Sequence, residues 1–396
     1  MSVYRATSWP FLRLYALAFL FFSANSVLNV IVPLRSEALG ASNTMIGLIM
    51  GTYMLTCMFF RPWAGHFVHK YGAVRVLRIL LLVNGLALLL YTFTELEGFF
   101  IARLMQGVST AFFSMALQMG IIDSLPEEER SQGVSLYSLF TYMPTIVGPL
   151  IALGIWEWGG MKGFTATMIV ITAMTGLFGY TMAAQLPSGR REEEQAGTGM
   201  LEALRRIADH PSLVVCSLLM LVASVVFGAV SVFIPLYASQ VEYGNAGIFL
   251  MIQAGVIVGS RFVLRKRIPS DGKWHTRFIV GILLLAAAAS MLLSLSASMG
   301  QVILYAAAVL MGIAQALLYP TLMTYLTFVL PSASRNIRIG LFIASADLGI
   351  SLGGLTAGVI ADQISYSAMY AVCSGLVAVA ACAAVVYNRR IHQAAA

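Results

Sequence analysis

One apolar stretch of the chain, residues 99–122, carries a row of polar side chains that could do chemistry. At 100° per residue, a helix would place these side chains within about 120° of one another, on one face. Its members are Arg103, Gln106, Thr110, Ser114 and Gln118. Polar side chains inside an apolar span cost free energy, so they usually face a cavity or a partner. A buried guanidinium needs an anionic ligand or a set of acceptors. Arg103 is therefore either a substrate-carboxylate contact that could also tune proton transfer, or a structural hub between helices.

Other polar side chains share faces on further apolar runs. Asn25 and Asn29 lie one helical turn apart in residues 11–34, and Gln315 and Tyr319 do so in residues 301–327. Gln253 lies inside a third run, residues 246–264. We predict that these side chains, together with Gln106, Ser114 and Gln118 of residues 99–122, contribute to substrate binding. Gln253, Tyr53 and Tyr142 could line the binding cavity, with helix packing as the alternative interpretation.

A single carboxylate, Asp347, lies about ten residues into the apolar run 338–360. Placing a carboxylate there costs about 2.5–3.5 kcal/mol on insertion scales. Burial favours its protonated form and a nearby cation favours its ionised form, so it could take up and release a proton. Asp347 is thus a candidate for proton coupling, with a packing contact to a neighbouring helix as the alternative.

Charged residues near the ends of these runs favour structural roles. Asp123 could contact the loop cations Lys70 or Arg75 as a gate or cap. Arg61 is expected to snorkel or to take part in gating. The tract 127–130, Glu-Glu-Glu-Arg, is expected to be a solvated loop.

Metal and enzyme chemistry is not supported by the sequence. His66 and His69 have helical i, i+3 spacing, but two ligands without a third favour a solvated loop edge over a metal site. No nucleophile paired with a base, phosphate-binding loop or redox motif occurs. The sequence therefore predicts neither an enzyme nor a cofactor.

The elements that must position these residues are apolar helices. The chain has 396 residues, of which 59% are hydrophobic and 10% are charged, whereas soluble domains carry about 25% charged residues. Runs of about 20 apolar residues are long enough to cross a bilayer as helices. We predict twelve spans near 11–34, 44–66, 74–94, 99–122, 134–156, 163–185, 212–237, 246–264, 276–298, 301–327, 338–360 and 366–388.

The distribution of the basic residues indicates which ends of these spans face the cytoplasm. If the N-terminus is cytoplasmic, only Arg35 and Lys162 of the 24 lysines and arginines fall in outside loops, and Arg103 falls within a span. The positive-inside rule then places both termini in the cytoplasm. The chain is predicted to be a multi-pass protein of a bacterial-type cytoplasmic membrane. Its net charge of +7 reflects this topology, and the dispersed basic residues do not indicate nucleic-acid binding.

The chain also divides into two repeated halves. A charged, glycine-containing segment predicts a cytoplasmic linker over residues 187–210, between six-helix bundles over 1–186 and 211–396. Gly107 precedes Pro126 by nineteen positions, and Gly312 precedes Pro331 by the same interval. Because each half has an even number of spans, the repeat is parallel. Such repeats are typical of secondary transporters whose binding site lies between the halves.

These features resemble the major facilitator superfamily over essentially the whole chain. The loop motif Gly-x-x-x-Asp-Arg-x-Gly appears here with Gly65, His69, Lys70 and Gly72. The glycines and the basic residue fit the motif, but His69 replaces its aspartate. This departure puts the usual salt-bridged cytoplasmic gate in doubt.

Two further motifs fall in the appropriate spans. Arg103 and Gly107 form the Arg-x-x-x-Gly motif of the fourth span. Gly148-Pro149 retains the centre of the motif that marks drug/proton antiporters, without its flanking glycines. Within the superfamily, the segments 21–25, 60–65 and 133–140 are similar to exporters of opine-type metallophores, the staphylopine group.

The resemblance implies a monomeric exporter that works by alternating access and couples export to inward proton movement. Its cargo would be a zwitterionic metallophore with several carboxylates. Arg103, Asn25, Asn29 and Gln118 would contact the cargo, and Asp347 would carry the proton. A multidrug efflux antiporter for amphipathic compounds is the alternative, and an importer also fits because the antiporter motif is incomplete.

Overall fold

Long apolar helices make up most of the chain, because backbone groups in a bilayer must satisfy their hydrogen bonds within the segment. The computed structural model describes residues 5–182, 210–264, 267–269, 271–331 and 335–395. Eleven of the described helices are long and apolar enough to span a membrane. The predicted linker over 187–210 lies outside the described residues except for His210.

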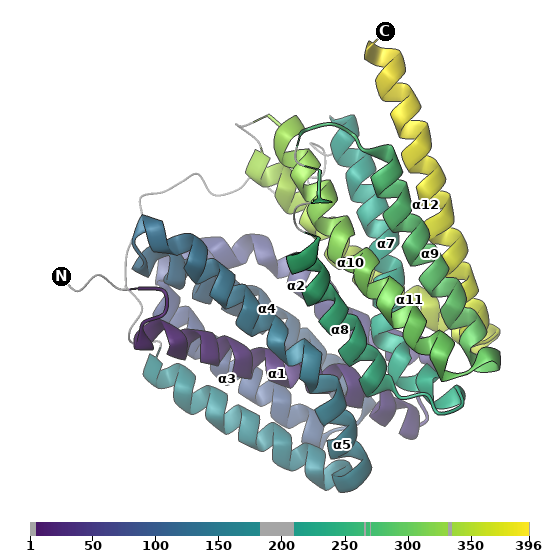
Figure 1. Ribbon diagram of the computed structural model, residues 1–396. Helices are drawn as coiled ribbons and strands as arrows, with labels where there is room; N and C mark the ends of the chain where they lie inside the picture. The colour runs from purple at the N-terminus through teal and green to yellow at the C-terminus, as the bar shows by residue number, and fades with distance from the viewer. Residues whose placement is uncertain (1–4, 183–209, 265–266, 270, 332–334, 396) are drawn as a thin grey trace. The chain divides into compact units, whose positions relative to one another are not determined.

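The described helices separate into two compact units. Of the described residues, unit 1 contains 5–40 and 52–182. Unit 2 contains Ala41–Gly51 and the described residues from His210 onward. The first half of the chain forms α1 (Trp9–Ala38), α2 (Asn43–Tyr71), α3 (Ala73–Phe93), α4 (Leu96–Ser124) and α5 (Glu127–Met182). The second half forms α7 (Pro211–Tyr237), α8 (Ala246–Val263), α9 (Thr276–Met299), α10 (Gln301–Val329), α11 (Arg335–Gln363) and α12 (Tyr366–Ala395) (Figure 1).

The 56-residue helix α5 contains two spans. At 1.5 Å per residue it would be about 84 Å long as a straight helix, far more than a bilayer core requires. Gly160 breaks the helical geometry with φ 51° and ψ −141°. Figure 1 shows the chain reversing direction at this bend. Counting α5 as two spans gives the twelve that the sequence predicts.

Two predictions about the ends of helices were wrong. The tract 127–130, expected to be a loop, forms the first turn of α5, where the Glu129 carboxylate accepts a hydrogen bond from the Ala6 N–H at 2.8 Å. α2 includes His66 and His69, which were expected at a solvated loop edge, and it continues to Tyr71 because no helix-breaking residue intervenes. It ends at Gly72, whose φ of +80° favours glycine.

Helix packing is the same in the two units. α1 packs on α5 as α7 packs on α11, and α3 packs on α4 as α9 packs on α10. Each unit also has one close crossing at a repeated glycine. A Cβ added to Gly107 would lie 2.5 Å from the Tyr53 carbonyl oxygen of α2, and one added to Gly312 would lie 2.9 Å from the Gln253 carbonyl oxygen of α8. The glycines that mark the sequence repeat therefore allow equivalent helices to approach closely.

The first turns of α2 belong to unit 2 and pack against α11. The Asp362 carboxylate accepts hydrogen bonds from the backbone N–H groups of Asn43 and Thr44, both at 2.8 Å. Ser351 Oγ donates to the Gly51 carbonyl oxygen at 2.9 Å. A carboxylate at a helix N-terminus satisfies free N–H groups and complements the helix dipole, so Asp362 fixes the start of α2.

Candidate functional site

Arg103 is the centre of the candidate site in unit 1. Its side chain projects from α4 and is 0% exposed. Nη1 donates to Asn25 Oδ1 at 3.1 Å, and Nη2 donates to Asn29 Oδ1 and to the Leu28 carbonyl oxygen, both at 3.2 Å. All three acceptors belong to α1. The stripe predicted on one face of α4 therefore brings its guanidinium group against the asparagines predicted on one face of α1.

Two tyrosine rings enclose the same guanidinium. Its carbon lies 5.6 Å from the Tyr53 ring centroid and 5.9 Å from the Tyr91 ring centroid, within the range of cation–π interactions. Tyr53 Oη accepts from Asn25 Nδ2 at 3.3 Å and donates to Thr110 Oγ1 at 3.2 Å. Tyr91 Oη donates to Gln106 Oε1 at 2.8 Å. The arginine hub comprises Asn25, Asn29, Tyr53, Tyr91, Arg103, Gln106 and Thr110, and it joins helices α1 to α4.

The rim of the hub is more accessible than its centre. Asn25 and Asn29 are partly exposed, whereas Tyr53, Tyr91 and Arg103 are buried. The two amides are thus the accessible part of the hub. A carboxylate is a stronger acceptor for a guanidinium than an amide is, so it could replace either asparagine as the partner of Arg103. The hub has the chemistry for capturing an anionic group.

The outer members of the predicted α4 stripe do not join the hub. Ser114 Oγ donates to the Ala111 carbonyl oxygen of its own helix at 3.2 Å. Gln118 is partly exposed one turn farther along α4. Their predicted roles as substrate ligands remain predictions.

The predicted site residues of unit 2 lie on α8, α10 and α11. Gln253 of α8 is buried, and its Nε2 donates to Gln315 Oε1 of α10 at 3.1 Å. The Tyr319 ring packs against Phe342 of α11 with centroids 5.7 Å apart. Asp347 follows on α11 and is 8% exposed. The structure thus pairs Gln253 with Gln315 and buries the predicted proton carrier.

The residues of the predicted gating motif differ in their surroundings. Arg61 Nη2 lies 3.6 Å from Cys57 Sγ one turn earlier on α2. Lys70 is exposed and lies 5.3 Å from the Tyr71 ring centroid. Asp123 is exposed near the end of α4. The side chain of His69 lies outside the described residues.

The glycines of the predicted motifs differ in how closely other atoms approach them. A Cβ at Gly65 or Gly72 would meet nothing within 4 Å, so only Gly72 is constrained, through its positive φ. A Cβ at Gly148 would lie 2.2 Å from Ser26 Oγ, which itself donates to the Pro144 carbonyl oxygen at 2.8 Å. Gly148 and Pro149 therefore lie where α5 crosses α1.

Tyr91 is the hub residue that the sequence reasoning missed. It ends a run of leucines on α3, and a buried phenol normally needs a hydrogen-bond partner. This isolated polar atom in an apolar run was the available signal. As for metals, no group of three His, Cys, Asp or Glu side chains within the described residues is placed to hold an ion.

The sequence of this chain is similar to those of known membrane transporters. The family model for the Major Facilitator Superfamily matches residues 14–303 and 271–395. The staphylopine export protein of Staphylococcus aureus (strain Mu50) is 51% identical over 376 residues, which cover 94% of this chain and 95% of that protein. Uncharacterized MFS-type transporters of Burkholderia mallei are 22% identical over 365 residues, covering 89% of this chain and 86% of theirs.

Solved structures share the fold at low sequence identity. The nucleoside transporter NupG, as a point mutant, superposes with a TM-score of 0.77 at 14% identity and covers 95% of this chain and 98% of its own. A bacterial homologue of the human lysosomal transporter Spinster, in an inward-facing and occupied conformation, gives a TM-score of 0.76 at 14% identity, with 96% of each chain covered. These two likenesses support the helical architecture alone.

Proposed function

The chain belongs to the major facilitator superfamily, and from this premise we propose that it exports an opine-type metallophore from the cell. It is a transporter and a multi-pass membrane protein, and it is not an enzyme. The observation that carries the cargo assignment is the 51% identity to the staphylopine export protein over nearly the full length of both chains.

The arginine hub supplies the chemistry that such a cargo needs. Opine-type metallophores carry several carboxylates, and a guanidinium donates two parallel hydrogen bonds to a carboxylate. Asn25 and Asn29 would contact the cargo first, and Arg103 would then exchange an amide acceptor for a cargo carboxylate. Gln106 would position the hub through Tyr91. In unit 2, Gln253, Gln315 and Tyr319 are the proposed cargo contacts.

Export is proposed to be coupled to inward proton movement by alternating access. Asp347 would bind a proton in one state and release it in the other, and Arg103 would tune this step. The protein would work as a monomer in the cytoplasmic membrane, with both termini in the cytoplasm. Its halves would be six-helix bundles over residues 1–186 and 211–396, joined by the linker over 187–210.

Deleting this protein from metal-starved cells should remove an opine-type chelator from the medium and raise its amount inside the cells. Mass spectrometry of the medium and of cell extracts measures both quantities. Restoring the intact chain should restore the extracellular chelator. The opposite finding, unchanged extracellular chelator together with intracellular accumulation of dyes or antibiotics, would favour a multidrug antiporter instead.

Replacing Asp347 by asparagine should abolish the response of transport to a pH gradient, because an amide cannot release a proton. Exchange of cargo across the membrane without a gradient should persist. Proteoliposomes loaded with an opine-type chelator measure both activities. Asp271→Asn, the same change at an exposed carboxylate between α8 and α9, is the matched control and should respond normally. Gradient-driven transport by the Asp347→Asn variant at the normal rate would exclude Asp347 as the proton site.

A further inference from the structure

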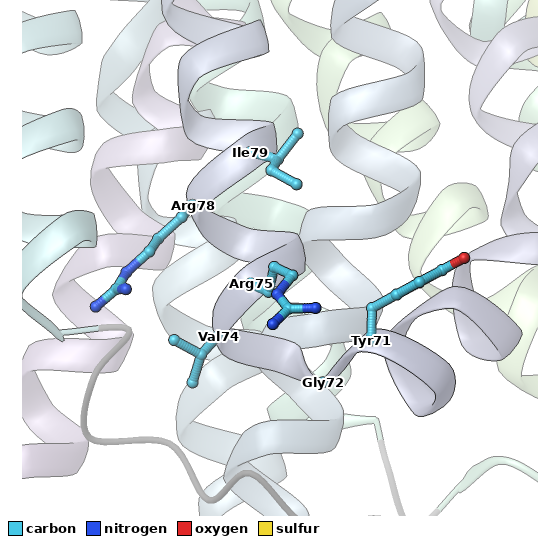
Figure 2. Close-up of a pocket in the computed structure, with 6 residues that line it drawn as sticks. All are labelled: Tyr71, Gly72, Val74, Arg75, Arg78 and Ile79. Carbon is cyan, nitrogen blue, oxygen red and sulfur yellow. The ribbon is translucent and has the colours of Figure 1, made fainter.

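A pocket at the junction of α2 and α3 contains none of the proposed cargo-binding residues. Its volume is about 330 Å³, and its lining consists of Tyr71, Gly72, Val74, Arg75, Arg78 and Ile79. All of these residues belong to unit 1. Figure 2 shows Arg75 and Arg78 projecting from the first turns of α3, with Val74 and Gly72 beside them. Two of the six lining residues are cationic and none is acidic, so the pocket suits an anion.

Arg78 is held in place but has a donor to spare. Its guanidinium carbon lies 4.7 Å from the ring centroid of Tyr180 on α5. Its Nε is buried and has no hydrogen-bond partner within the described residues. Arg78 as a whole is partly exposed, so the remaining N–H groups of its guanidinium can donate to a ligand oxygen in the pocket.

The start of α3 adds to the positive potential of this pocket. The helix begins after its N-cap residue Gly72, which has no side chain to cap the first turn. Free N–H groups and the positive end of the helix dipole therefore face the same region as the arginines. Helix N-termini combined with arginine side chains are typical of phosphate-binding sites.

The same face of α3 continues as an exposed apolar stripe. Ile79, Leu82 and Leu86 are 55%, 67% and 58% exposed. Ile79 follows Arg75 by four residues and Leu82 follows Arg78 by four, so each apolar side chain lies one turn beyond an arginine. Because α3 is a membrane span, this stripe is available to acyl chains. A cationic site followed directly by an apolar track matches the order of headgroup and chain in a phospholipid.

We propose that this pocket binds the phosphate of an anionic phospholipid, with Arg75 and Arg78 contacting the headgroup and the α3 stripe contacting an acyl chain. The site is separate from the arginine hub. It does not depend on the cargo, so the proposed transport function could fail while lipid binding stands, and the reverse.

Native mass spectrometry of the full-length protein in detergent with added phosphatidylglycerol tests the proposal. Each basic residue near an anionic headgroup strengthens lipid binding through its charge. We therefore expect Arg75→Gln and Arg78→Gln each to weaken lipid retention about fivefold. The double variant should weaken it by about 25-fold if the two effects add. Leu82→Asn should also weaken retention, since it interrupts the acyl track. Thermal unfolding of each variant verifies that it is folded, and the single variants keep the test valid if the double variant is not.

Arg13→Gln is the matched control. Arg13 also rests on an aromatic ring, 5.2 Å from the centroid of Trp9, but it lies outside the pocket. Its replacement should leave phosphatidylglycerol retention unchanged. Retention by the Arg75→Gln/Arg78→Gln variant equal to that of the unaltered protein would overturn the proposal. Displacement of the lipid by excess inorganic phosphate, with Leu82→Asn binding normally, would also overturn it, because the site would then recognise free phosphate.

Discussion

Replacing Arg103 by glutamine should reduce export at least about 30-fold, because the loss of one partner in a buried charge-assisted pair costs about 2–5 kcal/mol. In the proposed mechanism, the guanidinium binds a cargo carboxylate in exchange for Asn25 or Asn29. Glutamine is neutral and too short to donate to all three of the present acceptors. The amount of chelator in the medium of complemented, metal-starved cells measures this effect.

Folding should survive this substitution better than transport does. Burying a guanidinium carries a desolvation penalty that neutral glutamine avoids, and this gain offsets part of the loss of the three hydrogen bonds to α1. Thermal unfolding of purified Arg103→Gln should therefore differ little from that of the unaltered protein. Arg103→Lys keeps the positive charge but lacks the planar guanidinium group. Its export should therefore lie between that of the unaltered protein and that of Arg103→Gln.

Tyr91→Phe is the control within the hub. It removes the hydrogen bond from Tyr91 Oη to Gln106 but leaves the charge and its α1 acceptors in place. If Arg103 recognises cargo, Tyr91→Phe should reduce export far less than Arg103→Gln does. Normal export by folded Arg103→Gln would show that the arginine only joins helices α1 to α4.

Replacing Gly353 by valine should strongly destabilise the packing of α7 against α11. A Cβ at this position would lie 2.1 Å from the Val225 carbonyl oxygen and 3.0 Å from the Ala229 backbone nitrogen. Both atoms belong to the α7 backbone, which cannot rotate away as a side chain could. Overpacking of this kind typically costs about 1–3 kcal/mol, and a backbone clash lies at the upper end. We expect little monodisperse protein by size-exclusion chromatography and a lowered unfolding temperature.

Gly375→Val is the matched control, because it makes the same change inside the membrane helix α12. A Cβ there would meet nothing within 4 Å. This variant should elute and unfold like the unaltered protein. Equal stability of the two variants would contradict the close crossing of α7 and α11.

The same glycines illustrate what sequence can predict about this fold. The abundance of glycine in apolar runs indicates that helices approach closely. It does not say which helices meet. Gly349 and Gly353 lie against α7, whereas Gly354 and Gly358 lie against the start of α2. Neighbouring glycines on one helix thus serve two different partners, and only the packed structure assigns them.

The arginine hub likewise combines features that the sequence predicts with contacts that only the packed structure assigns. The one-sided polar stripe on α4 and the paired asparagines on α1 follow from helical periodicity, and both were predicted. Their mutual contact, and the enclosure of Arg103 by Tyr53 and Tyr91, depend on how four helices cross. Tyr91 was missed because its partner Gln106 is fifteen residues away on the next helix.

The sequence by itself determined the spans, the repeat and the family resemblance, because hydropathy over about 20 residues decides whether a segment crosses a bilayer. The extension of α2 to Tyr71, the helical start of α5 and the bend at Gly160 are also local, yet hydropathy alone did not define them. Only the tertiary structure decided the partners of Arg103, the glycine crossings and the contact of Arg78 with Tyr180. These features depend on distances between residues on different helices, and no short-range pattern in a sequence specifies such distances.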